Sequence, residues 1–117
     1  MLIQIADAEF RLHPAPSFEG WELYSRENSS GNIETLELRE GSFVLTEFRR
    51  DPAGYRTLGG GDTIEKAEQR YRVAKNEEIP DFDPLPEESW NDCLYHILFG
   101  AAQLSAAGAK PETEVVS

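Results

Sequence analysis

The sequence predicts an α+β protein: an antiparallel β-meander of about five strands in the N-terminal half, packed on one face by two C-terminal helices. Short runs of apolar, β-branched and aromatic residues, separated by turn residues, fill the first half of the chain. Two stretches with apolar residues at helical spacing follow them. Strands that precede helices, rather than alternate with them, favour an α+β arrangement.

The expected strands are separated by turns that contain glycine, proline or asparagine. Asn28–Asn32 is rich in turn formers, and Glu40–Ser42 is short enough to close a hairpin. A further turn at Asp51–Gly54 leads into a short last strand. We expect strands at Leu2–Ala6 with Glu9–Leu12 as its continuation, Phe18–Arg26, Ile33–Glu40, Phe43–Arg50 and Tyr55–Leu58.

A first helix is predicted after the glycines Gly59–Gly61, which we expect to end the last strand. Asp62 is a good N-cap, and Glu65 three residues later completes a capping box. The helix should end near Asn76. Its apolar face consists of Ile64, Ala67, Tyr71 and Ala74.

A second helix is predicted from near Pro86 to Ala107–Gly108, since proline and acids suit a first turn and glycine suits the C-terminal end. Tyr95 and Phe99 lie away from its main apolar stripe, so this helix is either buried on two sides or offers an aromatic patch to a partner. The stripe comprises Trp90, Cys93, Leu94, Ile97, Leu98, Ala101 and Leu104. We expect it to face the sheet opposite Trp21, Leu23, Leu36 and Leu38.

The length of 117 residues favours one domain, which we place at 1–108, followed by a flexible tail at 109–117. The single cysteine, Cys93, excludes a disulfide framework and fits a reducing compartment. No apolar run reaches the roughly 18 residues of a membrane span, and the N-terminus lacks the basic start of a signal peptide. We therefore expect a cytoplasmic protein.

The pattern of residues indicates no catalytic or metal site and no cofactor. His13 and His96 have no recognisable partner in the sequence, and Cys93 falls in an apolar stripe. Asp81–Asp83 lacks the spacing of a calcium loop. Gly59–Thr63 lacks the lysine and glycine spacing of phosphate and dinucleotide loops.

One local run resembles a known family. Tyr55–Ala67, with the sequence Gly-Asp-Thr-Ile-Glu-Lys-Ala at its end, is similar to the strand-turn-helix segment of HicB-type antitoxins. The Pro-Asp and Gly-Cys signatures that precede this segment in the family are absent here. The resemblance therefore implies a strand followed by a helix and assigns no functional residue.

Charge is distributed unevenly along the chain, whose net charge is −11. Positions 1–75 are close to balanced, whereas positions 76–117 carry nine acids and a single base, Lys110. Phosphate binding needs clustered basic residues, so direct nucleic-acid binding and attachment to an anionic membrane are disfavoured. The natural complement is a basic protein partner.

The densest acidic stretch is Glu77–Asp92, hereafter the acidic segment, with seven acids and no base. Phe82, Leu85 and Trp90 interleave with these acids and suggest apolar anchors within a steering surface. The alternative is an ordinary solvated loop. The predicted partner-binding residues are Glu77, Glu78, Asp81, Phe82, Asp83, Leu85, Tyr95 and Phe99.

These observations suggest a small acidic intracellular inhibitor without catalysis. The leading hypothesis is an immunity protein or antitoxin that occludes the active site or substrate groove of a basic, nucleic-acid-processing toxin. A phage anti-defence protein or nucleic-acid mimic would use the same physics. Two other hypotheses remain: a small enzyme whose carboxylates and His96 meet only in the fold, and a homodimeric adaptor joined through Tyr95 and Phe99. A deep pocket with convergent polar groups would favour an enzyme or a ligand-binding protein.

Overall fold

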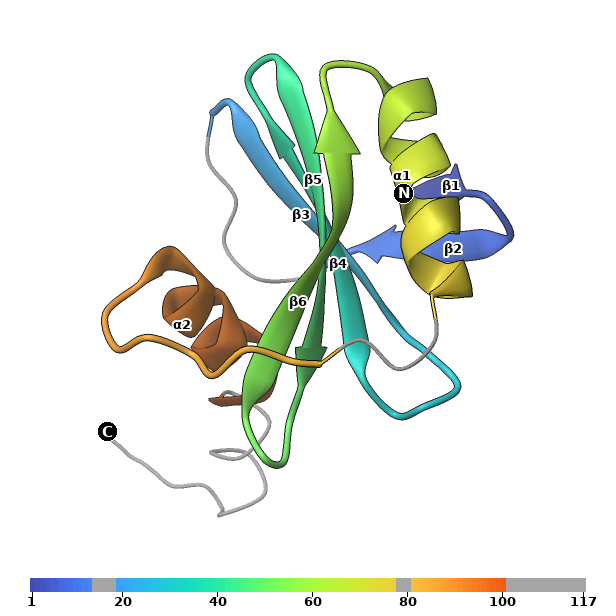
Figure 1. Ribbon diagram of the computed structural model, residues 1–117. Coiled ribbons are helices and arrows are strands. Elements are labelled where there is room, and N and C mark those ends of the chain that lie inside the picture. The colour runs from blue at the N-terminus through green and yellow to red at the C-terminus, as the bar shows by residue number, and fades with distance from the viewer. Residues whose placement is uncertain (14–18, 78–80, 101–117) are drawn as a thin grey trace. The chain divides into compact units, whose positions relative to one another are not determined.

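The computed structural model describes residues 1–13, 19–77 and 81–100. Its sheet is an antiparallel meander in which six strands follow one another in chain order (Figure 1). The predicted α+β class is confirmed, with six strands because Ala8–Leu12 pairs with the first strand as a strand of its own. The strands are β1 Leu2–Ile5, β2 Ala8–Leu12, β3 Trp21–Glu27, β4 Ile33–Arg39, β5 Ser42–Arg49 and β6 Gly54–Gly61.

The chain forms two compact units, the first from Met1 to Pro84 and the second from Leu85 onward. The first unit contains the sheet and helix α1, Ile64–Asn76. The described part of the second contains helix α2, Trp90–Tyr95, and a π-helix, His96–Gly100. The predicted tail at 109–117 lies outside the described residues. Within the described ranges, no helix has the length and apolar character needed to cross a bilayer.

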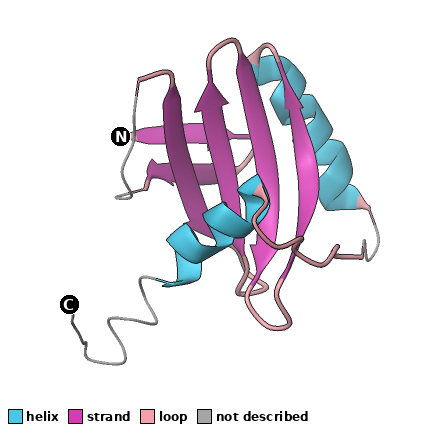
Figure 2. Ribbon diagram, turned by 90° about the vertical axis from the view of Figure 1, so that its left-hand side faces the viewer, coloured by secondary structure: helices cyan, strands magenta, loops and turns pink. Residues whose placement is uncertain are grey.

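Helix α1 covers one face of the sheet and contacts β6, β5 and β1. Figures 1 and 2 show the β1–β2 hairpin running across the direction of the other strands, beside α1. The rings of Phe10 and Tyr71 meet edge to face with their centroids 6.2 Å apart. The core of this unit therefore lies between α1 and the sheet. Its buried members are Ile5, Ala8, Phe10, Tyr24, Leu36, Leu45, Leu58, Ala67 and Tyr71.

The three glycines Gly59–Gly61 extend β6 and do not end it, which corrects the predicted strand boundary at Leu58. A Cβ atom on Gly61 would lie 2.8 Å from Cβ of Lys66, and one on Gly59 would lie 2.8 Å from Cβ of Arg70. Glycine at these positions lets the helix approach the strand more closely than any larger residue would allow.

The longer strand also moves the start of α1. Thr63, and not Asp62, is the N-cap, and its side chain accepts a hydrogen bond from the backbone N–H of Lys66 at 3.2 Å. The predicted cap at Asp62 is therefore wrong by one residue; its carboxylate instead pairs with the ammonium of Lys66 at 3.0 Å. The end of the helix at Asn76 is as predicted.

The second helix begins later than predicted. Ser89 is its N-cap and accepts from the N–H of Asp92 at 3.0 Å, while Glu88 has a positive φ of 60° that does not belong to a helix. Buried Leu94 and Phe99 are five positions apart, a spacing that suits a π-helical turn. The predicted 3.6-residue period therefore fails at Trp90 and Cys93, which are both exposed. Ala101, Leu104 and the predicted helix end lie outside the described residues.

Candidate functional site

A row of charged side chains crosses four strands on the face covered by α1. Arg26, Glu34, Glu47 and Arg56 stand opposite one another in register on β3, β4, β5 and β6. The two glutamates are 0% and 3% exposed. Like charges directly opposite in a sheet are destabilising, so this pair of carboxylates needs compensation. The flanking arginines supply part of it, with contacts of 2.8 Å to Glu34 and 2.7 Å to Glu47.

Asn28, just after β3, joins the two carboxylates. Its side-chain NH₂ donates to Oε2 of Glu34 at 2.9 Å and to Oε2 of Glu47 at 2.7 Å. Its side-chain oxygen accepts from the backbone N–H groups of Ser30 and Asn32, both at 3.0 Å. One side chain therefore shapes the β3–β4 turn and places donors between the two negative charges.

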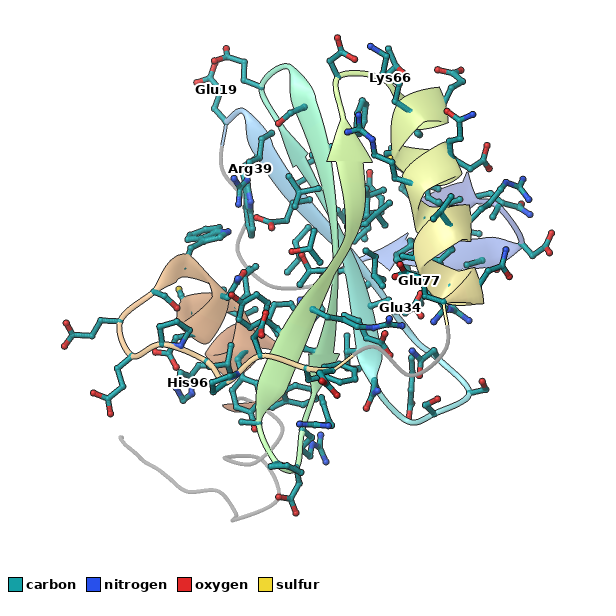
Figure 3. All side chains as sticks on the ribbon, viewed as in Figure 1. Glu19, Glu34, Arg39, Lys66, Glu77 and His96 are labelled. Carbon is teal, nitrogen blue, oxygen red and sulfur yellow. The ribbon has the colours of Figure 1, made fainter. Side chains whose placement is uncertain are left out.

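Helix α1 supplies the remaining donors to Glu34, which lies near the C-terminal end of that helix (Figure 3). The hydroxyl of Tyr71 donates to Oε1 and the ammonium of Lys75 donates to Oε2, both at 2.6 Å. Burial would raise the pKa of Glu34, but the hydrogen bonds from Lys75, Tyr71, Asn28 and Arg26 together lower it to about 2. Glu34 is therefore ionised at neutral pH.

Glu47 is held in the same way. Burial would raise its pKa, but donors from Asn32, Asn28 and Arg56 lower it. A general acid or base works best with a pKa near the operating pH, and these glutamates are shifted away from it. We call these residues and their partners the buried-glutamate cluster: Arg26, Asn28, Asn32, Glu34, Glu47, Arg56, Tyr71 and Lys75.

A groove of about 420 Å³ lies beside this cluster, where the β1–β2 turn, the β3–β4 turn and the last turns of α1 meet. Three of its side chains are basic, one is acidic, and several are neutral and polar. Its volume falls within the range of roughly 300–1,000 Å³ that is typical of small-ligand sites. The groove is lined by Ala6, Asp7, Ala8, Arg26, Asn28, Ser29, Tyr71, Arg72, Lys75 and Asn76.

The cluster is not evident from the sequence, because a glutamate in an alternating strand resembles a residue on the solvent-facing side. A signal was nevertheless present. Glu34 has the same parity as Leu36 and Leu38 on β4, so it lies on the face that α1 covers. Glu47 likewise has the parity of Leu45 on β5.

The described acids of the acidic segment in the first unit are exposed: Glu77, Asp81 and Asp83. Glu78 lies outside the described residues. The backbone of Asp83 exchanges two hydrogen bonds with that of Tyr55, of 2.8 and 3.0 Å, which fastens this part of the segment to β6. The exposed carboxylates of Asp81 and Asp83 are thus carried on anchored backbone.

Phe82 is half-buried against its own chain. Its ring lies under the guanidinium groups of Arg49 and Arg56, at 4.6 and 5.6 Å from the ring centroid. Gly54 permits this close approach, since a Cβ atom there would lie 3.2 Å from Cβ of Phe82. Phe82 was predicted to anchor a partner, and the structure gives it a role in holding the acidic segment to the β5–β6 hairpin.

The second unit contains the other predicted residues. Leu85 and Tyr95 are half-buried, and Phe99 is 2% exposed. The rings of Tyr95 and Phe99 pack together with centroids 4.8 Å apart, so the predicted aromatic edge is not an exposed patch at Phe99. Among the described residues of this unit, the exposed large apolar side chain is Trp90, at 42%.

His96 and Asp92 form a pair at 3.5 Å on successive turns of the second unit. The histidine side chain is two-thirds exposed. Among the residues that the structure describes, no three histidine, cysteine or acidic side chains gather where they could hold a metal ion. Comparisons with protein-family models, with curated proteins and with solved structures find no match to this chain.

Proposed function

We propose that this chain is a small acidic inhibitor that binds a basic protein, as an immunity protein or antitoxin binds a nucleic-acid-processing toxin. Its carboxylates would take the place of substrate phosphates and cover the active site or the substrate groove. One observation carries the proposal: the buried carboxylates of the sheet pair with four of the eleven basic residues, whereas Glu77, Asp81 and Asp83 of the acidic segment are exposed.

Four of the eleven lysines and arginines pair with buried acids of the first unit. Arg26 and Lys75 both pair with Glu34, and Arg56 pairs with Glu47. Arg39 pairs with Glu37, a third buried carboxylate, which also accepts from the indole N–H of Trp21 at 3.0 Å. Four basic residues are therefore matched by three buried acids.

The exposed acids of the first unit are differently placed. Glu77, Asp81 and Asp83 form no ion pair with lysine or arginine among the residues that the structure describes. The backbone of Asp83 and the ring of Phe82 hold Asp81–Asp83 in place. Carboxylates that are already positioned lose less conformational entropy when a partner binds. They are suited to steering a basic surface into place.

The test begins with a partner. The full chain is immobilised, and basic proteins of the source cell that bind at low salt and elute at high salt are identified by mass spectrometry. The captured protein is then purified, and its association rate is measured by stopped flow from low to high salt. Rim charges act mainly on this rate and on its salt dependence.

Two variants with the same change of net charge distinguish the acidic segment from overall acidity. The triple variant Glu77→Gln, Asp81→Asn, Asp83→Asn should associate about tenfold more slowly at low salt, with a flatter salt dependence. Its matched control neutralises three exposed acids outside the segment and should lose much less. Equal losses in the two variants, or no loss in the first, would contradict the proposed interface. The control positions are Glu9, Glu19 and Glu40.

A further inference from the structure

The groove beside the buried-glutamate cluster has a charge opposite to that of the molecule as a whole. Arg26, Arg72 and Lys75 line it, whereas the chain carries a net charge of −11. Asp7 is the acid among its lining residues. Arg26 and Lys75 compensate the buried Glu34, whereas Arg72 pairs loosely with the partly exposed Glu68, so the groove carries one base beyond those that the cluster needs.

Two of these cations are held in position by a buried carboxylate. Arg26 and Lys75 contact different oxygens of Glu34, at 2.8 and 2.6 Å, and that carboxylate is fully buried. Lysine has three N–H donors and arginine has five, so each retains donors beyond those that bind Glu34. Both side chains are partly exposed, Arg26 at 27% and Lys75 at 32%. The buried glutamate therefore orders two cationic groups at the wall of the groove.

The third cation lies on the same side of α1. Arg72 is three positions before Lys75, a spacing that places both on one face of a helix. Its own pairing is loose, at 3.7 Å to Glu68, and its side chain is 57% exposed. Ser29 and Asn76 add neutral polar groups to the lining. The wall thus offers several donors that converge on one space.

We propose that this groove binds a small phosphate ester, with the phosphate group against Arg26, Arg72 and Lys75. Guanidinium forks match phosphate oxygens with paired hydrogen bonds, and an ammonium adds a point charge. The volume of about 420 Å³ is larger than a bare phosphate ion needs and leaves room for the organic part beside Ala8 and Tyr71. This ligand site is independent of the proposed inhibitor surface.

Asp7 opposes this ligand and provides the sharpest test. It lies in the β1–β2 turn, which Glu68 fastens to α1 by accepting the backbone N–H of Ala6 at 2.5 Å. The Asp7 carboxylate is exposed at the groove wall, where it repels a phosphate. Its neutralisation should therefore tighten binding, and a variant that is merely damaged would not bind more tightly.

The experiment follows backbone amide signals by NMR while glycerol 3-phosphate, inorganic phosphate or glycerol is added to the full chain at constant ionic strength. We expect saturable shifts at Arg26, Ser29, Lys75 and Asn76 with glycerol 3-phosphate, weaker binding of inorganic phosphate, and no saturable shifts with glycerol. Equal or tighter binding of inorganic phosphate would overturn the assignment of an ester. A lack of saturable shifts with both phosphates would overturn the site.

Matched variants test the charges. Arg72→Gln should weaken glycerol 3-phosphate binding about threefold to fivefold, the scale of a partly exposed charge. Lys66→Gln makes the same charge change at an equally exposed position on α1 and should leave binding unchanged. Asp7→Asn should tighten binding about threefold, and its control Glu40→Gln should not. Equal effects of Arg72→Gln and Lys66→Gln, or weaker binding by Asp7→Asn, would overturn the proposal.

Discussion

The buried-glutamate cluster and the acidic segment use the same side-chain chemistry in opposite ways. In the cluster, Glu34 and Glu47 are almost fully buried and stand opposite each other, and donors from Asn28, Arg26, Arg56 and α1 compensate both charges. In the acidic segment, Asp81 and Asp83 are exposed, and what holds their stretch in place is backbone pairing to Tyr55. The comparison shows that location and donors, not residue type, decide whether a carboxylate stabilises the fold or remains available at the surface.

Arg56 connects the two regions. Its guanidinium donates to Glu47 at 2.7 Å and lies over the ring of Phe82 at 5.6 Å. The same side chain thus compensates a buried charge and helps to hold the exposed acidic segment. Substitutions in the buried-glutamate cluster and in the acidic segment should therefore show which contacts stabilise the fold and which support partner binding.

The largest effect is expected where a buried charge is removed. Glu34→Gln should lower the free energy of unfolding by about 2–4 kcal/mol, because Arg26 and Lys75 lose their carboxylate partner in a buried site. Urea denaturation measures this loss. Glu27→Gln, at an exposed position on β3, is the matched control and should change stability by less than about 0.5 kcal/mol. A similar small effect at Glu34 would mean that the cluster does not stabilise the fold.

Acid should weaken the same cluster. The pKa of Glu34 is lowered from 4.5 to about 2, so its contribution to stability is complete above pH 4.5 and is lost as the pH falls toward 2. The pKa of Glu47 is lowered as well, so its contribution to stability is also lost as the pH falls. The urea midpoint of the wild type should therefore decline through this window, and that of Glu34→Gln should decline less. Parallel declines would show that Glu34 does not carry the pH dependence.

Phe82→Ala tests the connection at Arg56. We expect a loss of about 1–2 kcal/mol in the free energy of unfolding, from the lost cation–π contacts with Arg49 and Arg56 and from lost burial. Phe82→Leu keeps an apolar side chain without the aromatic face, so it should lose roughly half as much. If Phe82→Ala leaves stability unchanged and only accelerates release of the partner, then the ring is a binding anchor and not an internal support.

The smallest effect on stability is expected in the acidic segment. The triple variant at Glu77, Asp81 and Asp83 should change the free energy of unfolding by no more than about 0.5 kcal/mol, because these side chains are exposed. Urea denaturation at low salt measures the change. A loss of several kcal/mol would contradict the comparison, since the carboxylates of the acidic segment would then stabilise the fold as those of the cluster do.

Local signals in the sequence were reliable where the decisive interactions are local. The turn formers at Asn28–Asn32 and Glu40–Ser42 do separate successive strands, and the apolar spacing of Ile64–Asn76 does specify α1. Asp62 failed as the predicted cap because the glycines before it continue β6, and that choice depends on how closely α1 approaches the strand. Packing of α1 against β6, and not the capping motif alone, thus moved a boundary by one residue.

By itself the sequence determined the α+β class, the meander order, the apolar face and C-terminal end of α1 and the uneven charge, since turn chemistry, hydrophobic period and composition act over short stretches of chain. Only the tertiary structure decided which charges are buried. Glu34 meets Lys75 across 41 positions of sequence, and no local pattern encodes that contact. A glutamate on a strand can be solvated or buried, and the outcome depends on donors that the fold brings from a different element, because burial of a charge is tolerated only where partners compensate it.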